Sequence, residues 1–239
     1  MMMQTRKVIL FIVEGKWDER SLAGILEDLV SADESISFQI VGTDLTSDMN
    51  SNTDNIEQRL IDQIEGKCAK EGFWHSDIKL VVQLMDMDGA FVEDDDIVEA
   101  VVDKTQYQDD CIQTKYVEKM KERNRRKGTI IRKLYRLNSL KNKYGEEYPY
   151  RTYYFSCNLE HVLHNKRNTP DFQKEQLAEV FSERFYENPT KFIEFLQQDT
   201  IRVEGDYLKT WEFIEQGHNA LHRHCNFHLY FRYNAFSEQ

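Results

Sequence analysis

Two apolar runs, each ending in acidic residues, constrain the fold of this chain more than any other feature. Residues 8–13 (VILFIV) precede Glu14, and residues 80–85 (LVVQLM) precede Asp86 and Asp88. Apolar runs that are rich in β-branched residues and show little alternation are typical of strands buried on both faces of a parallel sheet. Functional groups in such sheets lie at the carboxyl ends of the strands. We therefore expect Glu14, Asp86 and Asp88 to converge at one edge.

Carboxylates gathered at one edge repel one another, and the repulsion costs stability unless a cation or a shared proton relieves it. A hard divalent cation such as Mg2+ or Mn2+ takes oxygen ligands. The sequence therefore predicts a divalent metal site at the edge formed by Glu14, Asp86 and Asp88.

Strands and helices are predicted to alternate through the first part of the chain. Apolar residues recur at helical spacing over residues 17–30 and 56–68, while residues 37–41 and 78–84 have the composition of strands. This βαβαβ order predicts a parallel sheet with right-handed connections. The loop at residues 42–55 is rich in Asp, Asn, Ser and Thr, and we expect it to lie at the same edge as the acids.

The spacing of these acids resembles that of the Toprim domain, found in topoisomerases, bacterial primases and OLD-type nucleases. Glu14-Gly15 follows the first strand and Asp-x-Asp-Gly occupies residues 86–89. The OLD and RloB-like branch is the more similar one, because it has a second acid four residues after the Glu, where Asp18 stands here. The similarity covers about residues 7–105 and implies a mainly parallel, helix-flanked α/β sheet.

The resemblance also implies roles for these residues. Glu14 would act as general acid or base, with Asp86 and Asp88 as the other catalytic residues, and all three would bind metal together with Asp18. Ala90 stands where the longer Asp-x-Asp-x-Asp form has its third Asp. The resemblance therefore leaves open whether the site binds one or two Mg2+ ions.

A second, shorter stretch resembles the same branch. A strand is predicted at residues 150–156, and it is followed by a polar helix start and an apolar helix that ends in His. The resemblance implies residues that support the metal site, namely Asn158, Glu160, His161 and His164. A capped helix start with incidental histidines is the alternative interpretation.

Residues 115–143 carry twelve Lys or Arg against two acids, although the whole chain has a net charge of −11. This segment is the one place where the electrostatics favour a nucleic-acid backbone, and interspersed tyrosines suit stacking on bases. The predicted contacts are Arg123, Arg125, Arg126, Lys127, Arg132, Lys133 and Arg136. The alternative is a solvated pair of helices that packs on the acidic surface of the chain itself.

Two further clusters have open interpretations. The acids at residues 93–96 either complement the dipole of a helix over residues 97–102 or reach the metal edge. Near the C-terminus, two pairs of histidines are spaced four residues apart, as on one face of a helix, namely His218 with His222 and His224 with His228. These histidines either contact phosphate or metal or have a structural role. Residues 169–239 otherwise indicate three helices, with residues 229–231 as a final strand or packing stretch.

The overall composition narrows the class of protein. With 239 residues, 40% of them hydrophobic and 31% charged, the chain has the composition of a globular protein. No apolar stretch approaches the roughly 18 residues needed to cross a bilayer, and four widely separated cysteines indicate free thiols, so we expect a cytoplasmic protein. The expected units are a Toprim-like core at 1–110, a basic helical insertion at 111–148, and a strand-helix completion with a helical cap at 149–239.

The function predicted from the resemblance is a Mg2+-dependent nuclease that cleaves phosphodiester bonds of DNA or RNA. The resemblance further implies defence against phages or mobile elements and a partner ATPase. One alternative is a haloacid-dehalogenase-like phosphatase with Asp86 as nucleophile and Asp88 as acid. That family normally has this motif on its first strand, and its later Gly-Asp-x-x-x-Asp motif would need an acid where Thr210 stands. A module that binds nucleic acid or a partner without catalysis is the other alternative.

Overall fold

The computed structural model describes residues 6–234, which form an α/β fold around a five-stranded sheet. Four neighbouring strands are parallel and the edge strand is antiparallel to its neighbour. In their order across the sheet, the strands are β2 (Glu34–Ile40), β1 (Lys7–Val13), β3 (Ile78–Asp86), β8 (Glu147–Phe155) and β7 (Ser139–Lys141). The prediction of a mostly parallel sheet flanked by helices is thereby confirmed.

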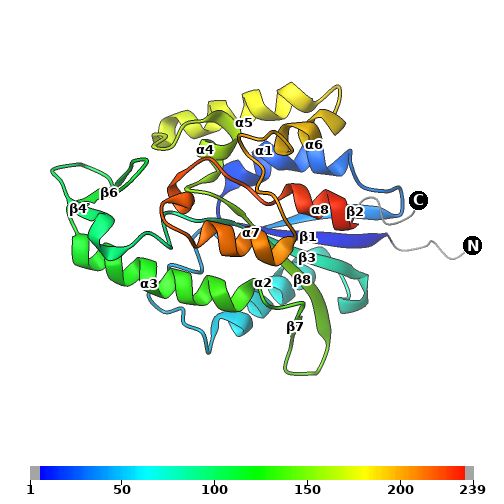
Figure 1. Cartoon of the computed structure of the whole chain (residues 1–239). Helices are drawn as coiled ribbons and strands as arrows, with labels where there is room; N and C mark the ends of the chain where they lie inside the picture. The colour runs from blue at the N-terminus through cyan, green and yellow to red at the C-terminus, as the bar shows by residue number, and fades with distance from the viewer. Residues whose placement is uncertain (1–5, 235–239) are drawn as a thin grey trace, which may run out of the picture.

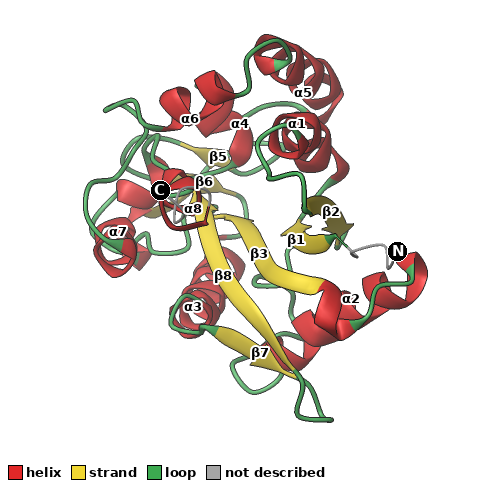
Figure 2. Ribbon diagram, turned by 90° about the vertical axis from the view of Figure 1, so that its right-hand side faces the viewer, coloured by secondary structure: helices red, strands yellow, loops and turns green. Residues whose placement is uncertain are grey.

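Both faces of the sheet are buried, as the apolar runs predicted. Successive side chains of a strand point to opposite faces, so Val8 and Leu10 of β1 enter one core while Ile9 and Phe11 enter the other. The first core is covered by α2 (Ile56–Glu71), α3 (Val117–Leu134) and α7 (Tyr207–Ile214). The second core is covered by α1 (Lys16–Glu27), α4 (Leu159–His164), α5 (Asp171–Phe185), α6 (Thr190–Leu196) and α8 (His228–Asn234) (Figure 2).

Helix α3 accounts for most of the basic segment, and it belongs to the core of the sheet. Its buried residues Asn124, Lys127, Ile131 and Leu134 recur every three or four positions and therefore share one face. Gly128 lets this face approach closely, since an added Cβ would lie 3.1 Å from the backbone oxygen of Ala90. The alternative interpretation of this segment as a solvated pair of helices is wrong, because a single helix is followed by strand β7.

A small second sheet projects beyond the carboxyl ends of the large one, on the side away from the termini (Figure 1). It contains β4 (Ile97–Glu99), β6 (Ile112–Thr114) and β5 (Gln106–Tyr107), after a 3-10 turn η2 (Asp94–Asp96). The helix expected over residues 97–102 is therefore wrong. Strand β4 pairs with β6, and Ile97 packs with Ile112 in a small core of their own.

The C-terminal part also differs from its prediction. Residues 169–234 form four α-helices instead of three, and residues 229–231 belong to helix α8. The aromatic side chains of α8 pack onto neighbouring rings, for example Phe231 onto Phe192 with 6.0 Å between ring centroids. The remaining 3-10 turns are η1 (His75–Asp77) and η3 (Asn219–Leu221). Within residues 6–234 no helix has the length and apolar character that a membrane span requires.

Candidate metal centre

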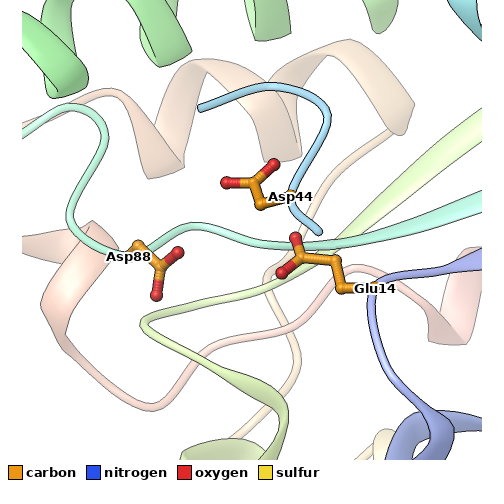
Figure 3. Close-up of side chains that lie close together, drawn as sticks. All are labelled: Glu14, Asp44 and Asp88. Atoms are coloured by element: carbon orange, nitrogen blue, oxygen red, sulfur yellow. The ribbon is translucent and has the colours of Figure 1, made fainter. Parts of the chain in front are cut away.

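Three carboxylates converge at the carboxyl ends of neighbouring strands (Figure 3). Glu14 follows β1, Asp88 follows β3, and Asp44 lies in the loop after β2. One oxygen of each lies within 4.8 Å of the others. The parallel order β2-β1-β3 brings these three strand ends to one edge, and the arrangement gives a set of oxygen ligands of the kind that hard divalent cations prefer.

The ammonium group of Lys127 lies against two of these carboxylates. Its Nζ is 2.7 Å from Asp44 Oδ2 and 2.9 Å from Asp88 Oδ2, and the lysine side chain is 0% exposed. Burial lowers the pKa of a lysine, but the carboxylates of Asp44 and Asp88 outweigh burial and raise the pKa of Lys127. Lys127 therefore stays charged and partly neutralises the centre.

Asp44 is the residue of this centre that sequence reasoning missed. Its Oδ1 accepts hydrogen bonds from the backbone N–H and the hydroxyl of Thr46, at 2.8 and 2.6 Å. Burial by itself would raise the pKa of Asp44, but the attraction of Lys127 and these hydrogen bonds lower it. The sequence feature that pointed toward Asp44 was the polar loop at residues 42–55. We expected this loop at the acidic edge but did not predict Asp44 as one of the metal ligands.

The segment that carries Asp88 is held in an uncommon conformation. Asp88 has φ 48°, in the left-handed region that side chains rarely adopt outside functional or turn positions. Its backbone N–H donates to the Cys157 oxygen at 2.7 Å, while Arg123 donates to its backbone oxygen. Asn124 fixes the next residue by donating to the Gly89 oxygen at 2.9 Å. Helix α3 and the end of β8 therefore position Asp88 together.

Glu14 also faces a second group of acids. Its Oε1 accepts a hydrogen bond from the backbone N–H of Asp86 at 3.3 Å. Glu14, Asp18 and Asp86 line a cavity of about 10 Å³, which is room for about one water-sized sphere. The Asp18 carboxylate is oriented by the backbone N–H of Gly15, which donates to it at 2.9 Å. The four acids predicted from the sequence thus lie together, with Glu14 between Asp88 and the pair Asp18 and Asp86.

Burial and mutual repulsion raise the pKa values of Glu14 and of this second group. Burial raises the pKa of Glu14 well above its usual value, and the nearby Asp44 carboxylate adds to the effect. Burial followed by the Glu14 charge raises the pKa of Asp86 in the same way. For Asp18, burial raises the pKa to about 6 against the opposing Gly15 hydrogen bond. Because these groups interact, they titrate as a set and can share protons near neutral pH.

The second motif supports the site through one residue. The buried Glu160 forms an ion pair at 2.9 Å with Lys174, which is partly exposed. The charge of Glu160 contributes to the raised pKa of Asp18 and of Asp86. Asn158 caps helix α4 by accepting a hydrogen bond from the His161 backbone N–H at 2.9 Å. His164 packs edge-on against a phenylalanine. Burial lowers the pKa of His161 and of His164 to about 4, so both imidazoles are neutral at pH 7.

The basic residues of α3, and Arg136 just after it, are mostly engaged with the chain itself. Lys127 is fully buried, so its predicted contact with a nucleic-acid backbone must be corrected, and Arg123 is turned toward Asp88. Arg125 is 66% exposed despite a contact with Asp94. The other four contact neighbouring groups: Arg126 bonds Ser47, Arg132 pairs with Glu215, Lys133 pairs with Glu57, and Arg136 lies over Tyr135. Nucleic-acid binding by the exposed members stays a prediction.

The acid run and the C-terminal histidines form separate contacts. Asp96 pairs with His218 at 2.8 Å, and Asp94 contacts Arg125, so the metal centre takes its acids from elsewhere. His222 bonds the backbone oxygen of Asp109 at 3.0 Å. The expected helical faces are wrong for both histidine pairs, because only His228 belongs to an α-helix.

Comparisons of this chain with protein-family models, with curated proteins and with solved structures found no match.

Proposed function

We propose that this chain is a metal-dependent nuclease of Toprim type that hydrolyses phosphodiester bonds of DNA or RNA in the cytoplasm. The convergence of the Glu14, Asp44 and Asp88 carboxylates within 4.8 Å supports this proposal most strongly. A role in phage or mobile-element defence beside an ATPase rests only on the likeness of Glu14, Asp18 and residues 86–89 to the OLD and RloB-like pattern.

The charges of the centre fit a divalent cation such as Mg2+ or Mn2+. With all three carboxylates ionised, Glu14, Asp44 and Asp88 contribute three negative charges and Lys127 contributes one positive charge, which leaves two negative charges. A divalent cation would balance them, and it would lower the repulsion from Asp44 that adds to the effect of burial on the pKa of Glu14. The three side chains offer only oxygen atoms, which matches the preference of these metals.

The surrounding side chains suit hydrolysis of a phosphodiester. A metal bound by Glu14, Asp44 and Asp88 would supply a Lewis acid and lower the pKa of a water molecule. Burial raises the pKa of Glu14 and of Asp86, which suits carboxyl groups that transfer protons. Lys127 holds Asp44 and Asp88 in place through its two ion pairs. Its charge also opposes the repulsion between the acidic centre and a phosphate group.

A cleavage assay on DNA and RNA, with and without Mg2+ or Mn2+, tests the proposal. The wild type should cleave only with metal, and Glu14→Gln and Asp44→Asn should each slow cleavage at least about 100-fold, the lower range for loss of a catalytic proton-transfer group. Asp62→Asn is the matched control, because Asp62 is exposed on α2 and, among the described residues, accepts one side-chain hydrogen bond, from Gln58. It should cleave like the wild type.

The alternatives give different outcomes in the same assay. Hydrolysis of a phosphomonoester such as p-nitrophenyl phosphate, without cleavage of DNA or RNA, would indicate a phosphatase that uses Asp86 and Asp88. Metal-independent nucleic-acid binding without any hydrolysis would indicate a binding module. Either result contradicts the nuclease proposal, as would full activity in Asp44→Asn.

A further inference from the structure

A cavity of about 590 Å³ lies beside the acidic centre. Two segments form its walls, residues 102–107, which comprise the end of the β4–β5 loop and β5 itself, and residues 167–170 between α4 and α5. The side chains of Asn158, Glu160 and Lys174 complete the lining. Its volume falls within the range of roughly 300 to 1,000 Å³ that small-molecule sites occupy. The cavity is therefore large enough for one nucleotide-sized ligand.

This cavity shares two walls with the acidic centre. Tyr107 lines the cavity, and its hydroxyl is 3.5 Å from Asp88 Oδ1. On the other side, Glu160 and Lys174 line the cavity, and the charges of both act on the Asp18 carboxylate. A ligand in the cavity would consequently lie next to the groups proposed to hydrolyse a phosphodiester.

The walls combine positive charges with hydrogen-bonding groups. Lys104, Arg167 and Lys174 bring three cations to the cavity. Among the residues that the structure describes, the buried Nε of Arg167 has no hydrogen-bond partner. The acids that pair with Lys104 and Arg167 are Asp171 and Asp109, which are 76% and 81% exposed. Surface pairs of this kind contribute little, so a ligand anion can replace those acids.

Two side chains of the cavity can bond the edge of a planar base. The Glu160 carboxylate, held in place by Lys174, can accept hydrogen bonds, and the amide of Gln106 can donate and accept. A ligand that fits both the cations and these polar groups carries a phosphate and a base with a hydrogen-bonding edge. Nucleotides have this combination, and a paired base inside a duplex cannot enter such a cavity without leaving its stack.

We infer that the cavity binds one unpaired nucleotide of the substrate, next to the phosphodiester that is cleaved, so that single-stranded or locally unpaired nucleic acid is the preferred substrate. This inference rests on the proposed nuclease function. It assigns the phosphate of that nucleotide to Arg167 and Lys104, and the edge of its base to Glu160 and Gln106.

The first experiment measures binding of nucleoside monophosphates by NMR or calorimetry in EDTA, at up to about 10 mM, where ligands of millimolar affinity saturate. Arg167→Gln should weaken binding about tenfold, the effect of one lost charge-assisted hydrogen bond, and Lys104→Gln should weaken it several-fold. Lys104 is 70% exposed, so its variant reports on binding even if Arg167→Gln unfolds. Lys191→Gln, an exposed change on α6, is the control and should bind like the wild type.

The second experiment compares Mg2+-dependent cleavage of single-stranded and duplex substrates of one sequence. Single strands should be cleaved at least about tenfold faster, because a duplex must first unstack and unpair a base before it can enter the cavity. Equal cleavage of both, or nucleotide binding that Arg167→Gln and Lys104→Gln leave unchanged, overturns the inference while the nuclease proposal stands. Loss of binding in both variants, in a protein that cleaves neither substrate, keeps a nucleotide site and overturns the nuclease proposal instead.

Discussion

The carboxylates on the two sides of Glu14 differ in their ion-pair partners. On one side, Asp44 and Asp88 share the buried ammonium of Lys127. On the other, Asp18 and Asp86 make no ion pair within residues 6–234. Burial raises the pKa of Asp44, Asp18 and Asp86 alike, but the pKa is lowered overall only for Asp44. The ion pair with Lys127 on α3 therefore distinguishes Asp44, whose pKa is lowered, from Asp18 and Asp86, whose pKa values are raised.

This difference suits a division of roles in hydrolysis. Ionised carboxylates are needed as metal ligands, and the side with Lys127 provides them. Groups with a raised pKa are suited to proton transfer near neutral pH, and the other side provides those. Glu14 lies between the two sides, where its carboxylate belongs to the metal triad and also accepts from the Asp86 backbone.

The largest expected effect comes from removing the lysine. Among the described residues, Lys127→Met should leave Asp44 without an ion pair and Asp88 with only the 3.8 Å contact of Arg123. Removing one partner of a buried pair costs about 3 to 5 kcal/mol of the free energy of unfolding. Urea unfolding in EDTA measures it. Lys133→Met on the same helix is the control, because Lys133 is 31% exposed in its pair with Glu57 and such pairs contribute at most about 1 kcal/mol. Equal losses in both variants would contradict the assigned role of Lys127.

The second effect is stabilisation by metal. Mg2+ at about 100 times its Kd should raise the free energy of unfolding of the wild type by about 2.7 kcal/mol, because it binds only the folded state. Thermal melts with and without Mg2+ would show this as a rise in Tm. Asp44→Asn should reduce the rise and the exposed variant Asp62→Asn should keep it. Identical melting curves for all three proteins at millimolar Mg2+ would argue against the metal centre.

A smaller effect, with a definite sign, concerns pH. The pKa of Asp86 is raised in the folded protein, so above its unfolded pKa of about 4 the folded state binds the extra proton and loses stability as the pH rises. Asp86→Asn lacks this term. In EDTA it should therefore be more stable than the wild type at pH 7, and this advantage should shrink as the pH falls and vanish below about pH 4.

The free energies of unfolding of the wild type and Asp86→Asn must be compared at each pH, because histidines titrate over the same pH range. Burial lowers the pKa of His161, His164, His224 and His228 to about 4, so each makes the fold less stable as the pH falls below about 6.5. These contributions are common to the wild type and Asp86→Asn and cancel in the difference. Parallel pH curves for the two proteins would show that Asp86 is ionised in the folded state.

The sequence predicted the site best where the structure depends on residues that are adjacent in the chain. Residues 8–13 and 80–85 are apolar enough to require burial on both faces, so the positions of Glu14, Asp86 and Asp88 at one edge followed from the strands that precede them. The helix expected at residues 97–102 failed because β4 pairs with a strand fifteen residues further along the chain. A non-local pairing of this kind leaves no periodic pattern in the sequence.

The parts of the site that were missed depend on packing between distant elements. Lys127 looked like one cation among twelve, and only the close approach of α3 at Gly128 carries it to acids 83 and 39 residues earlier. Asp44 was one of several polar residues in its loop, and it is distinguished by its pairing with that same lysine. The ion pair between Lys127 and Asp44 thus explains why both residues were missed, because no sequence pattern indicates a contact between such distant positions.

The smallest effect on stability is expected for a change at Arg125, two residues before Lys127. The same change should have a separate effect on nucleic-acid binding. Arg125 is 66% exposed on the same helix, so Arg125→Gln should change the free energy of unfolding by less than about 0.5 kcal/mol. If Arg125 contacts a phosphate, its loss should lower the slope of log affinity against log salt by about 0.9 for duplex or 0.7 for single strands. Titrations at several salt concentrations measure it, with Lys191→Gln as the charge-matched control. An unchanged slope would mean that α3 serves the acidic centre through Lys127 and Arg123 alone, and that the substrate phosphates are held by other cations.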